Sequence, residues 1–205
     1  METIKNKLFT IAVNQHGAEL SSVRNNQTGR EYLWQADPTY WKRHSPVLFP
    51  IVGSVWNSEY RQNGQTYNLS QHGFARDMDF SLIAQSDNEL RYRLTDNENT
   101  HAKYPYPFEL EIGYRLDDNK ITVMWQVHNP SDKEIYFQIG AHPAFNYKEY
   151  NEQADVQAYF EIQPSASSLL LTVIGEKGCI TPDKKTYPLV NHLIPINKMT
   201  FNDDA

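Results

Sequence analysis

Short runs in which apolar and polar residues alternate recur along the whole chain. Residues 80–84 and 90–94 alternate on either side of the polar stretch 86–89, which is the pattern of a β-hairpin. Residues 108–116 and 121–127 repeat this pattern around an Asp-Asp-Asn turn. Further strands are predicted at residues 8–13, 19–23, 136–139, 160–162 and 169–173. The pattern is therefore that of a protein built from strands.

Turn and helix signals refine this picture. Asn63-Gly64 predicts a tight turn, and residues 47–52, which follow Pro46 and contain Pro50, read as an apolar strand. Helical periodicity is nearly absent, apart from one short turn at residues 37–41 that opens with an Asp-Pro pair, the aspartate being the N-cap. Many short strands at spacings of roughly 8–12 residues predict an all-β sandwich or barrel, in one domain over residues 1–205.

Composition narrows the class of protein. The chain has 205 residues, of which 40% are apolar, and this suits one domain with a sizeable core. The formal net charge of -6 argues against nucleic acid or an anionic membrane as a partner. No stretch approaches roughly 18 consecutive apolar residues, and the N-terminus runs into a strand pattern rather than a signal-peptide core. A single cysteine excludes a disulfide framework and a cysteine-rich zinc site. We therefore expect a soluble, cytoplasmic protein.

Two histidines lie in similar surroundings and are the best candidates for chemistry. His72 lies in segment 71–77 and His142 in segment 140–146, each after a strand-like run and among small residues and one aromatic. Small neighbours leave room for a ligand beside an imidazole, and histidine can give or take a proton near neutral pH. The purely structural alternatives are a loop histidine beside a turn glycine for the first, and an ordinary strand end before Pro143 for the second.

Other residues carry weaker signals. Arg76 beside Asp77 is either a structural ion pair or a group that could hold a hydroxyl or a phosphate. Trp34 and Trp41 are either core residues or a platform for a sugar, and His128 reads as a strand-end residue that serves a turn. Metal-ligand spacing, nucleotide-binding glycine motifs and a Gly-x-Ser-x-Gly motif are missing from the sequence, so we expect neither a metal site nor a serine hydrolase.

Five segments together resemble the aldose 1-epimerase (galactose mutarotase-like) family, in particular its bacterial branch encoded near lactose and galactose genes. They occur in the family's order and span most of the chain. The segments are GAEL at 17–20, EYLWQ at 31–35, SPVLFPIVG at 45–53, QHGFARD at 71–77 and GAHPAFN at 140–146.

The resemblance implies a β-supersandwich with an open cleft for a hexose, and interconversion of the α and β anomers of a free aldohexose without a cofactor. By similarity, both histidines are catalytic: His142 is the general acid that protonates the ring oxygen, and His72 binds the sugar and helps to stabilise charge at the same oxygen. Arg76 matches an arginine that contacts phosphate in the related hexose-6-phosphate branch, and its neighbour Asp77 favours an uncharged sugar by neutralising it. The remaining substrate-binding residues expected are Asn146 and Asp204.

The chain also departs from the family pattern. The family's catalytic glutamate has no counterpart here in a matching context. Residues 199–205 read like the start of another element, so we expect a sandwich that lacks its C-terminal strands. The alignment with the family's substrate-binding aspartate runs out at Asp203 and Asp204. Ser54 stands where the family often has a basic residue.

Three alternatives therefore stand beside an active epimerase of free sugars. They are a non-catalytic carbohydrate-binding module, a truncated inactive homologue and a hexose-6-phosphate 1-epimerase. Whether the chain is an enzyme, which sugar it prefers and its oligomeric state, a dimer included, stay open on the sequence alone.

Overall fold

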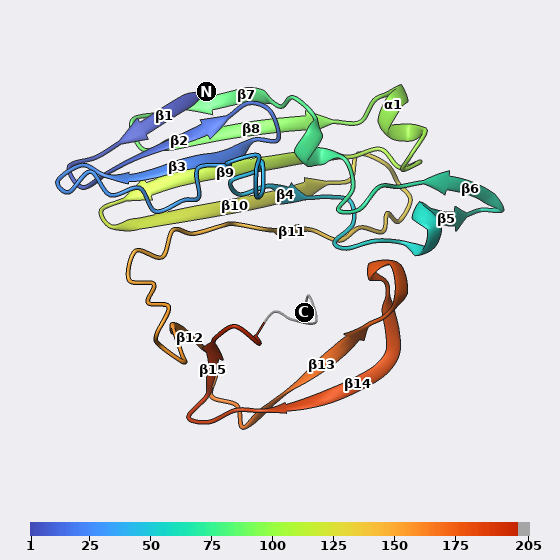
Figure 1. Ribbon diagram of the computed structural model, residues 1–205. Coiled ribbons are helices and arrows are strands. Elements are labelled where there is room, and N and C mark those ends of the chain that lie inside the picture. Colours follow the sequence, from blue (N-terminus) through green and yellow to red (C-terminus); the bar gives the residue numbers. More distant parts are fainter. Residues whose placement is uncertain (201–205) are drawn as a thin grey trace. The chain divides into compact units, whose positions relative to one another are not determined.

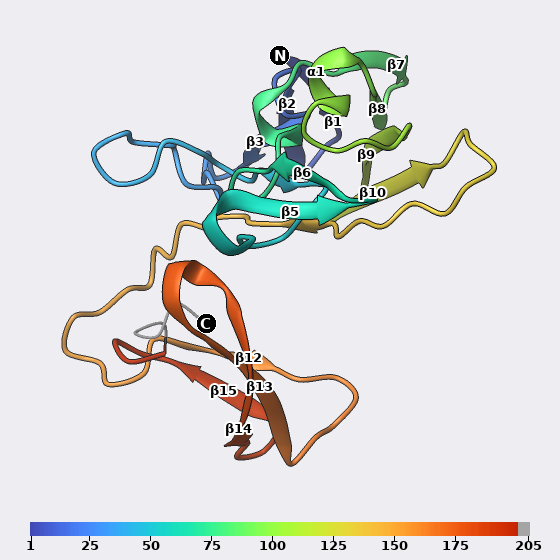
Figure 2. The ribbon, with the colours of Figure 1, turned by 90° about the vertical axis from the view of Figure 1, so that its right-hand side faces the viewer.

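Two compact units make up the part of the chain, residues 1–200, that the computed structural model describes. Residues 1–146 form the first unit, and the second begins at residue 147. Each unit is built mainly from antiparallel strand pairs, as Figure 1 and Figure 2 show. The all-β prediction is confirmed, whereas the grouping of both units into a single domain stays a prediction.

The two predicted hairpins join into one sheet of the first unit, with the strand order β10-β9-β8-β7. Along β8 every second residue is buried, namely Leu90, Tyr92 and Leu94. The alternation in the sequence thus becomes one face toward the core and one outer face. The strands are β7 Ser81–Gln85, β8 Glu89–Thr95, β9 Glu109–Asp117 and β10 Lys120–His128.

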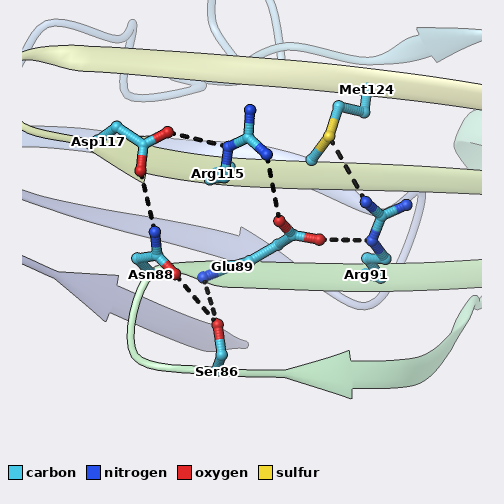
Figure 3. A network of polar contacts seen from close by, with 7 residues as sticks. All are labelled: Ser86, Asn88, Glu89, Arg91, Arg115, Asp117 and Met124. Carbon is cyan, nitrogen blue, oxygen red and sulfur yellow. Dashed lines mark hydrogen bonds and ion pairs between the residues drawn. The ribbon is translucent and has the colours of Figure 1, made fainter.

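The outer face of this sheet carries a polar network (Figure 3). Glu89 Oε1 accepts a hydrogen bond from Arg91 Nε at 2.5 Å, and Glu89 Oε2 lies 3.9 Å from Arg115 Nη1. Arg115 Nε donates to Asp117 Oδ2 at 2.9 Å. Partly exposed ion pairs of this kind contribute about 0–1 kcal/mol each, so the network adds little to stability and mainly keeps this face hydrophilic.

A second sheet of the first unit has the strand order β1-β2-β3. β2 and β3 confirm predicted strands, whereas the sequence pattern misses β1. One cluster of buried side chains draws on both sheets: Ile11 and Val13 come from β2, Leu110 and Ile112 from β9, and all four are fully buried. The core of the first unit therefore lies between the two sheets. The strands are β1 Glu2–Lys5, β2 Phe9–Asn14 and β3 Glu19–Asn25.

Shorter elements complete the first unit. β5 Glu59–Gln62 and β6 Gln65–Asn68 form a hairpin around the tight turn predicted at Asn63-Gly64, where both turn residues have positive φ. Helices are single turns, namely α1 Glu98–His101, η1 Trp56–Ser58 and η2 Ala75–Asp77. Across residues 1–200 the helices are too short to carry an apolar membrane span.

At two places the structure differs from the strands that the sequence pattern predicts. The apolar run 47–52 forms a ladder only in β4 Val47–Leu48, because Pro50 has no N–H to continue it. The strand predicted at 136–139 is wrong, since β11 covers only Gly140–Ala141. Its residues lie opposite the proline-interrupted segment, which cannot offer them a continuous ladder.

The second unit contains two antiparallel pairs within its described residues. β12 Ala158–Glu161 pairs with β15 Leu193–Ile196. β13 Ser168–Ile174 pairs with β14 Ile180–Pro188, and η3 Glu176–Gly178 lies in the connection between them. The strands predicted at 160–162 and 169–173 are thus confirmed in position.

Phe108 is fully buried in an aromatic cluster, with ring centroids 5.1 Å from Phe49 and 6.0 Å from Phe74. Phe108→Ala should lower the free energy of unfolding by about 3–5 kcal/mol, because it removes buried apolar surface and leaves a cavity. Leu82→Ala, at a side chain that is 40% exposed, should cost roughly 1 kcal/mol or less. Urea unfolding followed by tryptophan fluorescence measures both changes. Equal losses would contradict this placement of the core.

Candidate functional site

The extended segment 44–53, which contains β4, is the element to which both candidate histidines are attached. One of its edges pairs with β11, in a register that sets Ala141 opposite Val47. His142 follows directly, and its N–H donates to Pro46 O at 3.1 Å. This hydrogen bond sets the backbone of His142 opposite Pro46.

The other edge of the same segment holds His72. Phe49 forms a parallel bridge with Gly73, and Phe49 O accepts from Phe74 N at 3.0 Å. His72 N donates to Gly53 O at 2.8 Å, and Gly53 N donates to Nδ1 of the His72 ring at 3.0 Å. Because Nδ1 accepts this bond, the proton of the neutral imidazole is on Nε2.

Position 73 requires glycine. His72 and Gly73 have φ values of 64° and 71°, in the left-handed region. A Cβ at position 73 would lie 2.2 Å from Phe49 O and 2.5 Å from Phe49 C. Backbone therefore packs directly on backbone here, and this close approach lets the His72 ring reach Gly53.

The two attachments bring the imidazole rings of His72 and His142 together, with centroids 6.3 Å apart and an interplanar angle of 61°. The ring of Trp41 packs on His142 at 5.0 Å between centroids and an angle of 51°. His142 is exposed and His72 is half-buried. The two histidines predicted from the sequence thus share one site, and an aromatic face lies beside its more accessible ring.

Trp41 is carried by the predicted helical turn at residues 37–41. Asp37 Oδ1 caps the turn by accepting from Thr39 N at 2.9 Å, and Asp37 O accepts from Trp41 N at 2.9 Å. Trp34 Nε1 donates to Trp41 O at 2.8 Å, which holds the end of the turn. Both tryptophans are half-buried and lie outside the buried core. Of the two interpretations of Trp41, the geometry favours an aromatic face at the site.

Arg76 lies on η2, directly after the loop of His72. Its Nη2 donates to Gln71 O at 2.8 Å, while Nε has no hydrogen-bond acceptor within residues 1–200 and lies 3.8 Å from Asp77 Oδ2. Asp77, expected to neutralise Arg76, binds Arg43 Nη2 at 2.7 Å. Burial and the charge of Arg43 lower the pKa of Arg76, against the opposing effect of Asp77. Two guanidinium groups therefore share one carboxylate.

The other predicted residues are spread over the fold. Asn146 Nδ2 donates to Leu33 O at 2.6 Å, and Asn146 N donates to Tyr32 O at 2.8 Å, so its amide serves the backbone and its role toward a sugar stays a prediction. Asp204 lies outside the described residues, as does Asp203. No three metal-ligating side chains come together within residues 1–200.

Sequence reasoning missed Arg43 and left His44 without companions. The structure places His44 Nδ1 3.8 Å from Glu19 Oε2, with no hydrogen-bond partner among the described residues. The signal that could have pointed to Arg43 and His44 is their position in the sequence, because both directly precede Ser45 and Pro46.

Two hollows on the first unit lie apart from the imidazole pair. The larger, of about 570 Å³, is mostly apolar, and Val47, Ala141 and Pro143 belong to its lining. Because neighbouring residues of an extended segment point to opposite faces, His142 projects away from this hollow. The smaller, of about 390 Å³, is lined by aromatic residues around Tyr104. Neither His72 nor His142 is among the described residues that line these two hollows.

Comparison with known proteins decides the family. The sequence model of aldose 1-epimerase matches residues 2–173. The chain belongs to the aldose 1-epimerase family. The matched range contains both histidines and Arg76.

The relatives of this family member are longer than the chain. The chromosomal and plasmid forms of protein LacX from Lactococcus lactis subsp. lactis are each 37% identical to it over 149 residues, which is 70% of this chain and 50% of the relative. The chain thus spans about half the length of these curated relatives.

Solved structures confirm the fold class. A galactose mutarotase related enzyme from Lactobacillus acidophilus is 35% identical, with a TM-score of 0.90 over 98% of this chain and 67% of that chain. A galactose mutarotase-like protein from Lactobacillus casei is 34% identical, with a TM-score of 0.87 over 96% of this chain and 67% of that one. The β-sandwich of the galactose mutarotase type is therefore the fold of this epimerase-family chain.

Gly73→Ala tests the close approach of backbone that places His72. The variant should lower the free energy of unfolding by about 2–4 kcal/mol, because a positive φ and an overpacked contact with Phe49 add up. Gly64→Ala is the matched control, since φ is +79° there and no atom lies within 4 Å of the added Cβ; it should cost about 1–2 kcal/mol. Thermal unfolding of both variants gives the difference. The interpretation fails if Gly73→Ala costs no more than Gly64→Ala.

Proposed function

We propose that this protein interconverts the α and β anomers of a free aldohexose by general acid/base ring opening. The observation that carries the proposal is the imidazole pair of His72 and His142, 6.3 Å between ring centroids, with Trp41 packed on the exposed ring. Membership of the aldose 1-epimerase family supports the same reaction. A small-molecule sugar is then the partner.

The two histidines suit different tasks in this reaction. Nδ1 of His72 accepts from Gly53 N–H, so in the neutral ring Nε2 carries the proton, and by the family resemblance we assign this histidine to bind the sugar at its ring oxygen. His142 is exposed and packs against Trp41, and we assign its imidazolium the role of giving a proton to the ring oxygen. Trp41 offers an apolar face on which a sugar ring can stack.

The proton balance needs a second group. When the ring oxygen receives a proton, the anomeric hydroxyl loses one, the C1–ring oxygen bond breaks and the open aldehyde forms. Rotation about the C1–C2 bond followed by closure gives the other anomer, and the acid and the base return to their starting states. We assign no base within residues 1–200, because no described glutamate lies in the family's motif.

Polarimetry tests the proposal directly. Purified protein should speed the relaxation of optical rotation in freshly dissolved α-glucose or α-galactose, and His142→Ala should lose about 100-fold or more of that acceleration, the typical contribution of one proton transfer. His128→Ala, at an exposed histidine at the end of β10, is the matched control and should keep the wild-type rate. Relaxation at the buffer rate with wild-type protein would reject the proposal.

A carbohydrate-binding module without turnover is distinguished by the same samples. If calorimetry shows binding of galactose or glucose that His142→Ala and His72→Ala weaken, while optical rotation relaxes at the buffer rate, the chain is a binding module. Absence of both binding and turnover points to an inactive homologue.

A second candidate, epimerisation of a hexose 6-phosphate, is favoured by the charge around Arg76. Arg76 Nε lacks an acceptor within residues 1–200, and Asp77 is shared with Arg43. Two guanidinium groups with one carboxylate between them leave net positive charge, which a phosphate would complement.

Comparison of phosphorylated and free glucose separates the two substrates. If the phosphate binds here, Arg76→Ala should lower kcat/KM for glucose 6-phosphate by roughly 10- to 100-fold, the value of one or two charge-assisted hydrogen bonds, and leave free glucose unchanged. Arg61→Ala, at an exposed arginine on β5, controls for loss of a positive charge elsewhere. An equal loss for both sugars would reject a phosphate site at Arg76.

A further inference from the structure

Glu19 and Glu31 lie in two of the segments that resemble the family. Their carboxylates accept hydrogen bonds from backbone N–H groups of segments that flank His142. We infer that Glu19 and Glu31 are positioning residues for His142, which hold the imidazole in place without touching the sugar. The inference rests on the proposed function in naming His142 as the reacting acid. The placement of the ring itself is a structural quantity that can be measured without turnover.

Glu19, the first residue of β3, holds the segment that His142 pairs with. Its Oε1 accepts from His44 N at 2.8 Å and from Ser45 N at 2.9 Å. The side chain is only 14% exposed, so both bonds are shielded from water. The next residue is Pro46, whose carbonyl accepts from His142 N. The carboxylate therefore sets the position of the acceptor to which the His142 backbone is tied.

Glu31 holds the residues that bridge to the segment after His142. Its Oε1 accepts from Val23 N at 2.8 Å and from Leu33 N at 3.0 Å. Leu33 in turn forms an antiparallel bridge with Phe145. Val23 belongs to β3, so both glutamates tie the surroundings of His142 to the same strand.

These ties matter because the ladder at His142 is short. β4 and β11 pair over two residues only, and so short a ladder specifies position weakly. β3, by contrast, pairs along β2 from Glu19 to Asn25 and is part of the core sheet. The hydrogen bonds of the two carboxylates therefore tie the two segments that flank His142 to β3, which the core sheet holds in place.

The geometry also separates positioning from acid–base chemistry. At Glu19 both N–H groups bind the same oxygen, and a glutamine oxygen could accept both. At Glu31 the second oxygen accepts from Ser22 Oγ at 2.5 Å, and a hydroxyl can turn to accept from a glutamine amide instead. Glutamine should therefore replace either glutamate as a clamp, whereas it could not replace a residue that exchanges protons.

The experiment follows the His142 ring by NMR in ¹⁵N-histidine-labelled protein, with His142→Ala identifying its signals. Glu19→Ala and Glu31→Ala should each shift and broaden the His142 imidazole signals. They should lower kcat for mutarotation roughly 10- to 100-fold, the usual cost of a misplaced catalytic group, with a smaller change in KM. Glu19→Gln and Glu31→Gln should restore wild-type signals and keep kcat within about threefold.

Asp96→Ala is the matched control, because Asp96 Oδ1 also accepts a backbone bond, from Phe108 N at 2.8 Å, but beside α1. It should lower the melting temperature and leave the His142 signals in place. Unchanged His142 signals in folded Glu19→Ala and Glu31→Ala would overturn the inference, as would glutamine variants as impaired as the alanine ones. Glu19→Asp, whose carboxylate is one methylene shorter, replaces Glu19→Ala if that variant does not fold. If wild-type protein shows no mutarotation, the proposed function fails while the NMR comparison still decides positioning.

Discussion

Backbone hydrogen bonds along both edges of segment 44–53 are the constraint on which the site depends. Its prolines have no N–H to donate, yet Pro46 O accepts from His142 N and Pro50 O accepts from Gln138 N. The residues that stop β4 after Val47–Leu48 thus still offer carbonyls to the neighbouring segment.

The imidazoles of His72 and His142 differ in exposure and in hydrogen bonding because they are attached to segment 44–53 in different ways. The half-buried His72 ring accepts a hydrogen bond from the Gly53 N–H through Nδ1. The His142 ring is exposed and rests against Trp41. Arg43 and Arg76 add positive charge near the loop of His72, with Asp77 between them. The orientation and exposure of the two imidazoles therefore differ because their attachments to the surrounding chain differ.

Local pattern predicted most of the strands, and long-range contacts account for what it missed. Alternation located β7 to β10, and in β8 it corresponds to the burial of every second residue. It failed at residues 136–139, whose apolar run packs beside a proline-interrupted segment without a ladder. The two histidines were found from their similar neighbours. The roles of Arg43 and Glu19 depend on partners dozens of residues away, which no short window of sequence contains.

The alternation of faces along residues 141–143 has a consequence for how this protein can change. Ala141 and Pro143 line the apolar hollow, and the alternation of side chains along an extended segment turns His142 to the opposite face. Inserting or deleting one residue just before His142 would exchange these faces and turn the imidazole into the hollow. Replacing a neighbour with another side chain would leave the direction of the ring unchanged. The segment should therefore tolerate drift in residue type while its length stays fixed, so that gaps in an alignment, more than mismatches, mark family members that have lost the site.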